Sequence, residues 1–127
     1  MVEDLTRHQM DSEYYSVSSE TASIINEAKE KRKKIIAVGT STVRTLETVT
    51  VSGFQITGTR GWTDKFIYPP YKFKMVDSLI TNFHQPKSTL MMMVSAFTTK
   101  DFLLEAYQEA INKKYNFYSY GDAMIII

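Results

Sequence analysis

Apolar and polar positions divide the chain into short segments that alternate between the spacing of strands and that of helices. Residues 14–17 are rich in strand-forming side chains, and Ser18 or Ser19 can cap a helix that runs to about Lys33. The continuous apolar run at 35–39 predicts a strand that is buried on both faces. A helix is predicted to follow the glycine at the end of that strand.

The middle of the chain predicts further strands and an apolar helix. The alternating, threonine-rich stretch at 49–60 indicates a hairpin with turns at its two glycines, and residues 66–68 indicate a strand that a proline pair ends. Residues 79–83 predict another strand, because Pro86 forces the chain to leave it soon afterwards. The run at 89–97 is apolar on every side, which is typical of a helix enclosed by protein.

Two more elements close the chain. Residues 100–115 place apolar side chains at helical spacing after a threonine cap, and residues 124–127 predict a final buried strand. Strands that alternate with helices are typical of α/β proteins. The sequence therefore predicts a single α/β unit over residues 1–127, with a mixed sheet flanked by helices.

Composition excludes several classes of protein. The length of 127 residues suits about one domain, and a net charge of +1 argues against a dedicated basic nucleic-acid-binding domain while leaving a local patch possible. The basic run at 29–34 indicates a solvent-exposed helix end rather than a site that binds RNA phosphate. Cysteine is absent, which excludes disulfides and thiolate catalysis. No apolar run is long enough for a membrane span, so no membrane partner is expected.

Candidate chemistry gathers where the strand at 79–83 ends. Asn82 and His84 stand at its carboxyl end, and Lys87 and Ser88 stand at the start of the following helix. Such a loop suits a carboxylate, a phosphate or a polarised base. A lone histidine is also often a hydrogen-bonded structural residue, and that alternative remains open for His84.

A second candidate site follows the strand at 35–39. Gly39, Thr40 and Ser41 form a glycine turn into a hydroxyl-rich helix start, which is compatible with binding of an anion or a ribose. The alternative is that Thr40 simply caps the helix, with Arg44 pairing to Glu47 one turn along. If the two strands are parallel, their carboxyl ends share one edge of the sheet, and both candidate sites would line one cleft.

Four separated motifs, in the right order, resemble one known family, the S-adenosylmethionine:tRNA ribosyltransferase-isomerases of queuosine biosynthesis. The resemblance covers the last third or so of that family's length. It implies a C-terminal fragment, belonging to the larger α/β domain of a two-domain enzyme. The motifs are HQMDSEYY at 8–15, AVGTSTVRTLE at 37–47, GWTDKFIYPPYKFKMVDSLITNFHQPKSTL at 61–90 and YSYGDAMIII at 118–127.

The resemblance implies a cytoplasmic enzyme that moves the ribosyl moiety of S-adenosylmethionine onto 7-aminomethyl-7-deazaguanine at the wobble position of tRNA. The product would be epoxyqueuosine, with adenine and methionine released. This chemistry needs a base, an acid and a pocket that excludes water, but no metal. Candidate catalytic residues are His84, Asp64 and Asp77, and candidate residues for binding S-adenosylmethionine are Gly39, Thr40, Ser41, Arg44, Asn82, Lys87 and Ser88.

Two other functions remain open for the chain itself. It can be a binding module that holds S-adenosylmethionine or tRNA without turnover, or a structural fragment with neither activity. We expect the isolated chain to be inactive, because catalysis falls steeply when positioning groups are missing. We also expect it to self-associate, since the apolar helix at 89–97 and the terminal strand would normally be covered.

Overall fold

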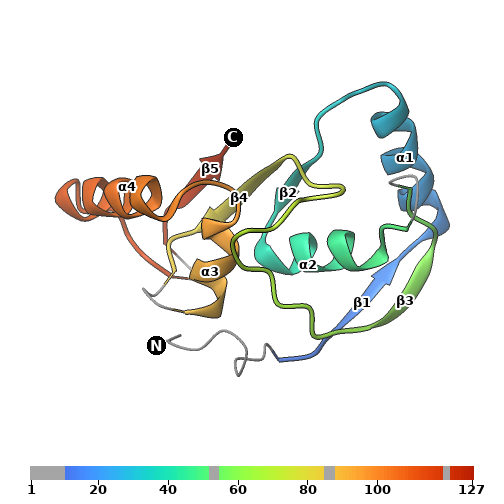
Figure 1. Ribbon diagram of the computed structural model, residues 1–127, viewed down its shortest axis with the longest axis horizontal. Coiled ribbons are helices and arrows are strands. Elements are labelled where there is room, and N and C mark those ends of the chain that lie inside the picture. The colour runs from blue at the N-terminus through green and yellow to red at the C-terminus, as the bar shows by residue number, and fades with distance from the viewer. Residues whose placement is uncertain (1–10, 52–54, 85–87, 119–120) are drawn as a thin grey trace.

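The computed structural model describes residues 11–51, 55–84, 88–118 and 121–127, and over these ranges it contains two sheets and four helices (Figure 1). In the smaller sheet, β1 (Glu13–Val17) pairs antiparallel with β3 (Thr59–Thr63). In the larger sheet, β4 (Ser78–Asn82) lies between β2 (Ile36–Val38), which is parallel to it, and β5 (Ala123–Ile126), which is antiparallel. The predicted mixed α/β architecture is confirmed.

Three of the four helices in the described part of the chain begin where the sequence places polar caps. The hydroxyl oxygens of Ser18, Ser88 and Thr99 each accept a hydrogen bond from a backbone N–H in the first turn of the helix that follows. The first helix ends three residues before the predicted Lys33, next to Arg32, which adopts a φ of 56°. The helices are α1 (Ser19–Glu30), α2 (Thr40–Val49), α3 (Thr89–Ser95) and α4 (Lys100–Asn112).

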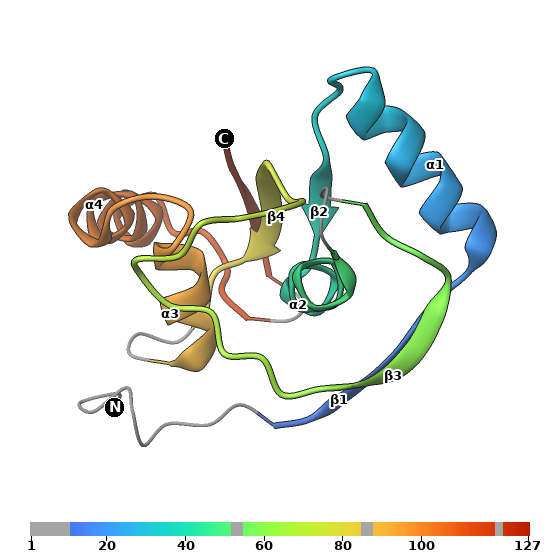
Figure 2. The same ribbon diagram turned by 45° about the vertical axis from the view of Figure 1, so that its right-hand side comes forward.

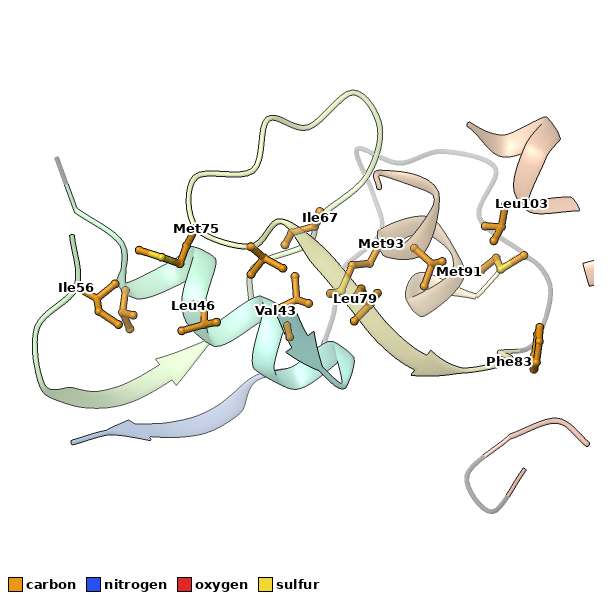
Figure 3. Packing of buried hydrophobic residues seen from close by; sticks show 14 of the residues in the cluster. Val43, Leu46, Ile56, Ile67, Met75, Leu79, Phe83, Met91, Met93 and Leu103 are labelled. Carbon is orange, nitrogen blue, oxygen red and sulfur yellow. The ribbon is translucent and has the colours of Figure 1, made fainter. Parts of the chain in front are cut away.

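Helix α2 lies between the two sheets. Figures 1 and 2 show β2 and β4 on one side of α2 and the β1–β3 ribbon on the other. Val43 and Leu46 of α2 are buried, and they join Leu79 of β4 and Met93 of α3 in one apolar cluster (Figure 3). The helix that the glycine turn starts therefore forms the centre of the core.

The apolar helix α3 is enclosed as predicted. Each of its residues is buried or half-buried, and Met93 and Val94 have no exposed surface. Helix α4 covers part of this core with Leu103 and Tyr107, but Phe102, which has helical spacing with them, is 64% exposed. The predicted apolar stripe of α4 is therefore narrower than the sequence indicates.

The prediction that the strand at 35–39 is buried on both faces is wrong. Ile36 is 50% exposed and Val38 is 66% exposed, whereas Ala37 between them is buried. Within the described residues β2 pairs with β4 alone, and a described helix covers only its Ala37 side. The final strand is also less buried than predicted, since Ile125 on the opposite edge of the sheet is 53% exposed.

Two predicted strands differ from those observed. Within the described residues the stretch at 49–60 forms no pair of strands of its own, because Val49 still belongs to α2 and β3 pairs with β1. Its own pairing is limited to one isolated bridge, between Val51 and Gln55. Gly53, the first expected turn, lies outside the described residues. Gly58 serves close packing instead of a turn, since a Cβ atom there would lie 2.8 Å from the Cα of Ser19. Residues 66–68 form an irregular segment that buries Ile67.

A buried carboxylate joins α2 to the segment that leads into β4. Glu47 is 1% exposed, and its oxygens accept hydrogen bonds from the N–H groups of Lys74, Met75 and Val76 at 2.8 to 3.1 Å and from the hydroxyl of Tyr71 at 3.0 Å. Burial, and then the charge of Glu47, raise the pKa of Tyr71 well above its usual range. Glu47 therefore does not pair with Arg44, contrary to the sequence alternative.

Replacing this carboxylate should destabilise the whole unit. Glu47→Gln keeps the side-chain size but points amide N–H donors at backbone N–H donors. We therefore expect the free energy of unfolding to decrease by about 3 kcal/mol. The matched control is Glu27→Gln, which removes an exposed ion pair with Lys31 and should cost about 0.5 kcal/mol or less. Denaturant unfolding monitored by circular dichroism measures both; equal losses in the two variants would contradict this account of Glu47.

Candidate functional site

The carboxyl ends of β2 and β4 lie side by side. The parallel register pairs Val38 with Ile80, and the N–H of Gly39 donates a 2.8 Å hydrogen bond to the carbonyl of Ile80. Neighbouring strands are about 4.8 Å apart, so the turn that starts α2 adjoins Thr81 and Asn82. The two candidate sites therefore share one edge of the sheet, as their order in the sequence predicts.

The first turn of α2 leaves backbone donors available at this edge. Its N-cap is Gly39, at a φ of 95°, and no side chain in the described part of the chain accepts a hydrogen bond from the helix start. The alternative that Thr40 caps the helix is therefore wrong. The hydroxyl of Ser41 donates to Glu13 at 3.2 Å, and that of Thr42 donates to the carbonyl of Val38 at 2.9 Å. A helix start with free N–H groups attracts anions.

His84 is held at the same edge by two side chains. Its Nε2 lies 2.9 Å from the hydroxyl oxygen of Thr81, and its backbone N–H donates to the hydroxyl oxygen of Tyr107 at 2.8 Å. Burial lowers the pKa of the His84 imidazole below its usual value. The ring is therefore neutral near pH 7 and can accept a proton.

Other predicted residues at this edge have structural partners. The side-chain amide of Asn82 donates to the carbonyls of Asp122 at 3.2 Å and Gly121 at 3.4 Å, which ties β4 to the turn before β5. The hydroxyl oxygen of Ser88 caps α3 by accepting from Met91 at 3.1 Å. Lys87, whose charge the sequence places between them, lies outside the described residues.

Arg44 is 2% exposed, and its guanidinium is fully engaged inside the protein. It donates to the carbonyls of Asp11 at 2.8 Å, Lys65 at 3.1 Å and Thr63 at 3.2 Å, and it forms a 3.1 Å ion pair with Glu13. These contacts fasten the β1–β3 ribbon to α2. The guanidinium of Arg44 is therefore buried among these partners within the described part of the chain.

The two predicted carboxylates lie in different places. Asp77 precedes β4, and its carboxylate accepts a 2.8 Å hydrogen bond from the N–H of Ile35 at the amino end of β2. The five residues of β4 separate Asp77 from Asn82 by about 17 Å. Asp64 is exposed, and it lies between Thr63 and Lys65, whose carbonyls accept hydrogen bonds from Arg44 of α2. The structure thus does not bring Asp77 to the edge that holds His84.

Sequence reasoning missed the partners of His84 and of Arg44. Tyr107 is 23 positions after His84, and its helical spacing indicated a core residue without indicating a hydrogen bond. Glu13 is an acidic residue in a short strand, and its contact with α2 depends on the pairing of β1 with β3. Neither contact has a local signal, because each joins elements that are distant in sequence.

A groove with a volume of about 560 Å³ lies between α1 and the β2–α2 unit. Of the predicted site residues it includes Ser41, and most of its lining is apolar. Within the described part of the chain, no three acidic or histidine side chains converge as metal ligands, and no helix is long and apolar enough to cross a membrane. The groove and the edge that holds His84 are distinct features of the surface.

Comparison with known proteins identifies the family. A family model described as "Queuosine biosynthesis protein" matches residues 1–126. The chain belongs to this family. It is 54% identical over 125 residues to the S-adenosylmethionine:tRNA ribosyltransferase-isomerase of Macrococcus caseolyticus, and 55% identical over 125 residues to the protein of that name from a Sulfurihydrogenibium species. The family resemblance read from the four motifs is thereby confirmed.

The match covers nearly all of this chain but a minor part of its relatives. It includes 98% of the chain and 37% of the Macrococcus caseolyticus protein. The crystal structure of S-adenosylmethionine tRNA ribosyltransferase from Thermotoga maritima superposes with a TM-score of 0.79 at 52% identity, over 90% of this chain and 40% of that one. The chain therefore spans little more than a third of the length of the curated relatives it matches.

The burial of His84 predicts a dependence of stability on pH. The pKa of His84 is lower in the folded chain than in the unfolded chain, so the unfolded chain takes up the proton first on acidification. The free energy of unfolding therefore has its full value above about pH 6.5. It decreases at lower pH, by at most about 1.4 kcal/mol per pH unit.

Two measurements check this expectation. Urea unfolding at pH 7.5 and 5.5 should show a smaller loss on acidification for His84→Gln than for the unchanged chain. An NMR titration should place the pKa of the His84 ring below 6.5. A ring that titrates at or above 6.5 would show that burial does not control its charge.

Proposed function

We propose that this chain supplies part of the site of an enzyme that transfers the ribosyl moiety of S-adenosylmethionine to tRNA. The observation that best supports this proposal is the 54% identity, across 98% of the chain, to a protein named S-adenosylmethionine:tRNA ribosyltransferase-isomerase. The proposed acceptor is the aminomethyl group of 7-aminomethyl-7-deazaguanine at the wobble position. The product is epoxyqueuosine, and adenine and methionine leave. Because its acceptor is tRNA, we place the whole enzyme in the cytoplasm.

The reaction needs a base that removes a proton from the carbon next to the sulfonium and an acid that assists the departure of adenine. We propose His84 for the proton transfer. Its neutral imidazole lies at the carboxyl edge of the parallel strands, where ligands gather in α/β folds. The contacts of His84 with Thr81 and Tyr107 support this role, because they fix the ring and the backbone next to it.

The anionic end of S-adenosylmethionine fits the start of α2. Gly39 turns the chain there, and the N–H groups of Thr40 and Ser41, which have no side-chain cap among the described residues, suit the methionine carboxylate. Asn82 and Ser88 border this edge, and the charge of Lys87 belongs to the same proposed site. In this arrangement Arg44 acts by positioning the β1–β3 ribbon. Asp64 is the better candidate to face the sulfonium or the substrate amine, since Asp77 bonds at the far end of β4.

In a full-length enzyme that contains this chain, His84→Ala should lower kcat/KM for adenine release by about 100-fold or more. Its melting temperature should fall little, because the side chain makes one hydrogen bond to the described residues, worth about 1 kcal/mol. The control is Glu109→Ala, which removes an exposed ion pair on α4 and should leave turnover unchanged. A steep loss of melting temperature with normal activity of the folded fraction would make His84 structural.

The isolated chain should release no adenine from S-adenosylmethionine in the presence of the modified tRNA. It lacks most of the length of its relatives, and missing positioning groups reduce catalysis steeply. It should also self-associate at micromolar concentrations through the outer edge of β5, where Ile125 and Ile127 are exposed.

An adenine-release assay and sedimentation test these two expectations, and calorimetry with S-adenosylmethionine tells a binding module from a structural fragment. A strict monomer that turns over substrate would contradict both. Measurable binding without turnover would support the alternative that this chain is a cofactor-binding module on its own.

A further inference from the structure

The hydroxyl of Thr81 has one hydrogen-bond partner among the described residues, the ring of His84. Its Oγ1 lies 2.9 Å from Nε2 of that ring. Thr81 is 6% exposed, and it shares the core side of the sheet with the buried Leu79 and Phe83, because alternate residues of a strand face the same side. A buried donor that finds no acceptor is destabilising. The acceptor available to the Thr81 hydroxyl in the described part of the chain is therefore Nε2 of His84.

This contact decides which nitrogen of the neutral His84 ring carries the proton. In a neutral imidazole one nitrogen donates and the other accepts, so the proton is on Nδ1 if Nε2 accepts from Thr81. In the opposite arrangement Nε2–H would donate to Thr81, and the proton of the buried hydroxyl would have no acceptor among the described residues. Satisfying the Thr81 hydroxyl therefore favours the tautomer that is protonated at Nδ1.

The Nδ1 side of the ring is the side that can meet a ligand. His84 is half-buried, and Nδ1 has no hydrogen-bond partner among the described residues. The backbone N–H of His84 is held by Tyr107, so the base of the side chain is fixed. In this tautomer the ring offers a ligand an N–H donor, and Nδ1 has no lone pair with which to remove a proton from carbon.

No charged side chain in the described part of the chain competes with Thr81 for the ring. The described ion pairs do not include His84, and its described hydrogen bonds are those with Thr81 and Tyr107. Burial raises the pKa of Tyr107, so its hydroxyl stays neutral. The partner of one ring nitrogen sets the role of the other, and Thr81 is the described side chain in that position.

We propose that Thr81 holds His84 as the Nδ1–H tautomer, and that this N–H donates a hydrogen bond to a ring nitrogen of the adenine of bound S-adenosylmethionine. The inference rests on the proposed function and deepens it, because it assigns His84 to the departure of adenine. When the bond from adenine to the ribosyl carbon breaks, its electron pair stays on adenine, and a donor at a purine nitrogen stabilises the charge that develops there. Thr81 acts through His84 and is a positioning residue.

The hydroxyl of Thr81 can keep this contact in both charge states of the ring. A hydroxyl donates and accepts, so it can turn to accept from Nε2–H when the ring takes up a proton there. The N–H at Nδ1 is present before and after that step. The donor that faces the ligand is therefore the same in the neutral and the protonated ring.

Nitrogen-15 NMR of the imidazole rings tests the tautomer in this chain. His8 and His84 are its two histidines, so His8→Gln leaves one ring to observe. At about pH 7.5 we expect the proton on Nδ1. Thr81→Val removes the hydroxyl at nearly constant size and should lower the ratio of Nδ1–H to Nε2–H about fivefold, which corresponds to the loss of one hydrogen bond. Thr81→Ser restores a hydroxyl and should restore the ratio.

Thr50→Val is the matched control for the loss of a buried hydroxyl. The hydroxyl of Thr50 is buried and donates to the carbonyl of Leu46 at 2.6 Å, at the end of α2. This variant should lose stability as Thr81→Val does but leave the tautomer of His84 unchanged. An equal shift of the tautomer in both variants would reflect a general loss of structure and overturn the role of Thr81. An Nε2–H tautomer in the unchanged ring would overturn it as well.

Adenine release by a full-length enzyme that contains this chain tests the role of the donor. Asparagine places an amide nitrogen near the position of Nδ1, whereas alanine places none there. We expect kcat of His84→Asn to exceed that of His84→Ala by at least about tenfold. Thr81→Val should lower kcat about fivefold with KM little changed, and Thr81→Ser should restore it.

Two outcomes of this assay overturn the assignment to adenine, and they are distinguishable. Equal loss of kcat in His84→Asn and His84→Ala, with the Nδ1–H tautomer observed, would show that a donor at Nδ1 is not what the reaction uses, while the proposed function of His84 stands. Unchanged adenine release in His84→Ala would remove His84 from the reaction altogether. The tautomer measured in the isolated chain does not depend on either result.

Discussion

The carboxylate of Glu47 is the contact on which the arrangement of the core depends. A buried charge is costly unless polar groups surround it, and here three backbone N–H groups and one hydroxyl do so, with no cation among the described residues. Those N–H groups belong to an irregular segment that would otherwise bury unpaired donors. By satisfying them, α2 determines where the chain enters β4, and therefore where β4 ends at Asn82, two residues before His84.

Arg44, the second buried charge of α2, bonds to a different part of the chain from Glu47. Arg44 bonds to carbonyls near β1 and at the end of β3, whereas Glu47 bonds to N–H groups before β4. One helix thus joins two sheets that share no strand. The pair also explains why an ion pair within the helix, which is the simple expectation for residues three apart, does not form: each charge has several better-placed partners elsewhere.

The sequence predicts elements well where the signal is local, and less well where it depends on neighbours. Ser18, Ser88 and Thr99 cap helices as predicted, because a cap involves residues three apart. The run at 35–39 was assigned as fully buried because apolar content does not reveal how many strands flank it. The shared edge of Gly39 and His84 could be predicted from the order of strands and helices. The position of Asp77 at the far end of β4 depends on which residue begins the strand, and periodicity does not specify that.

The contacts of His84 have a consequence for the order in which the protein is made. The strand that delivers this residue is held by segments that follow it: Tyr107 bonds to the backbone of His84, the N–H of Tyr118 donates to the carbonyl of Phe83, and β5 pairs along β4. Synthesis proceeds from the amino end, so the imidazole cannot reach its final position until more than thirty later residues have emerged from the ribosome. A partly made chain can form its amino-terminal contacts, but the proton-accepting group is placed only after these later residues have been made.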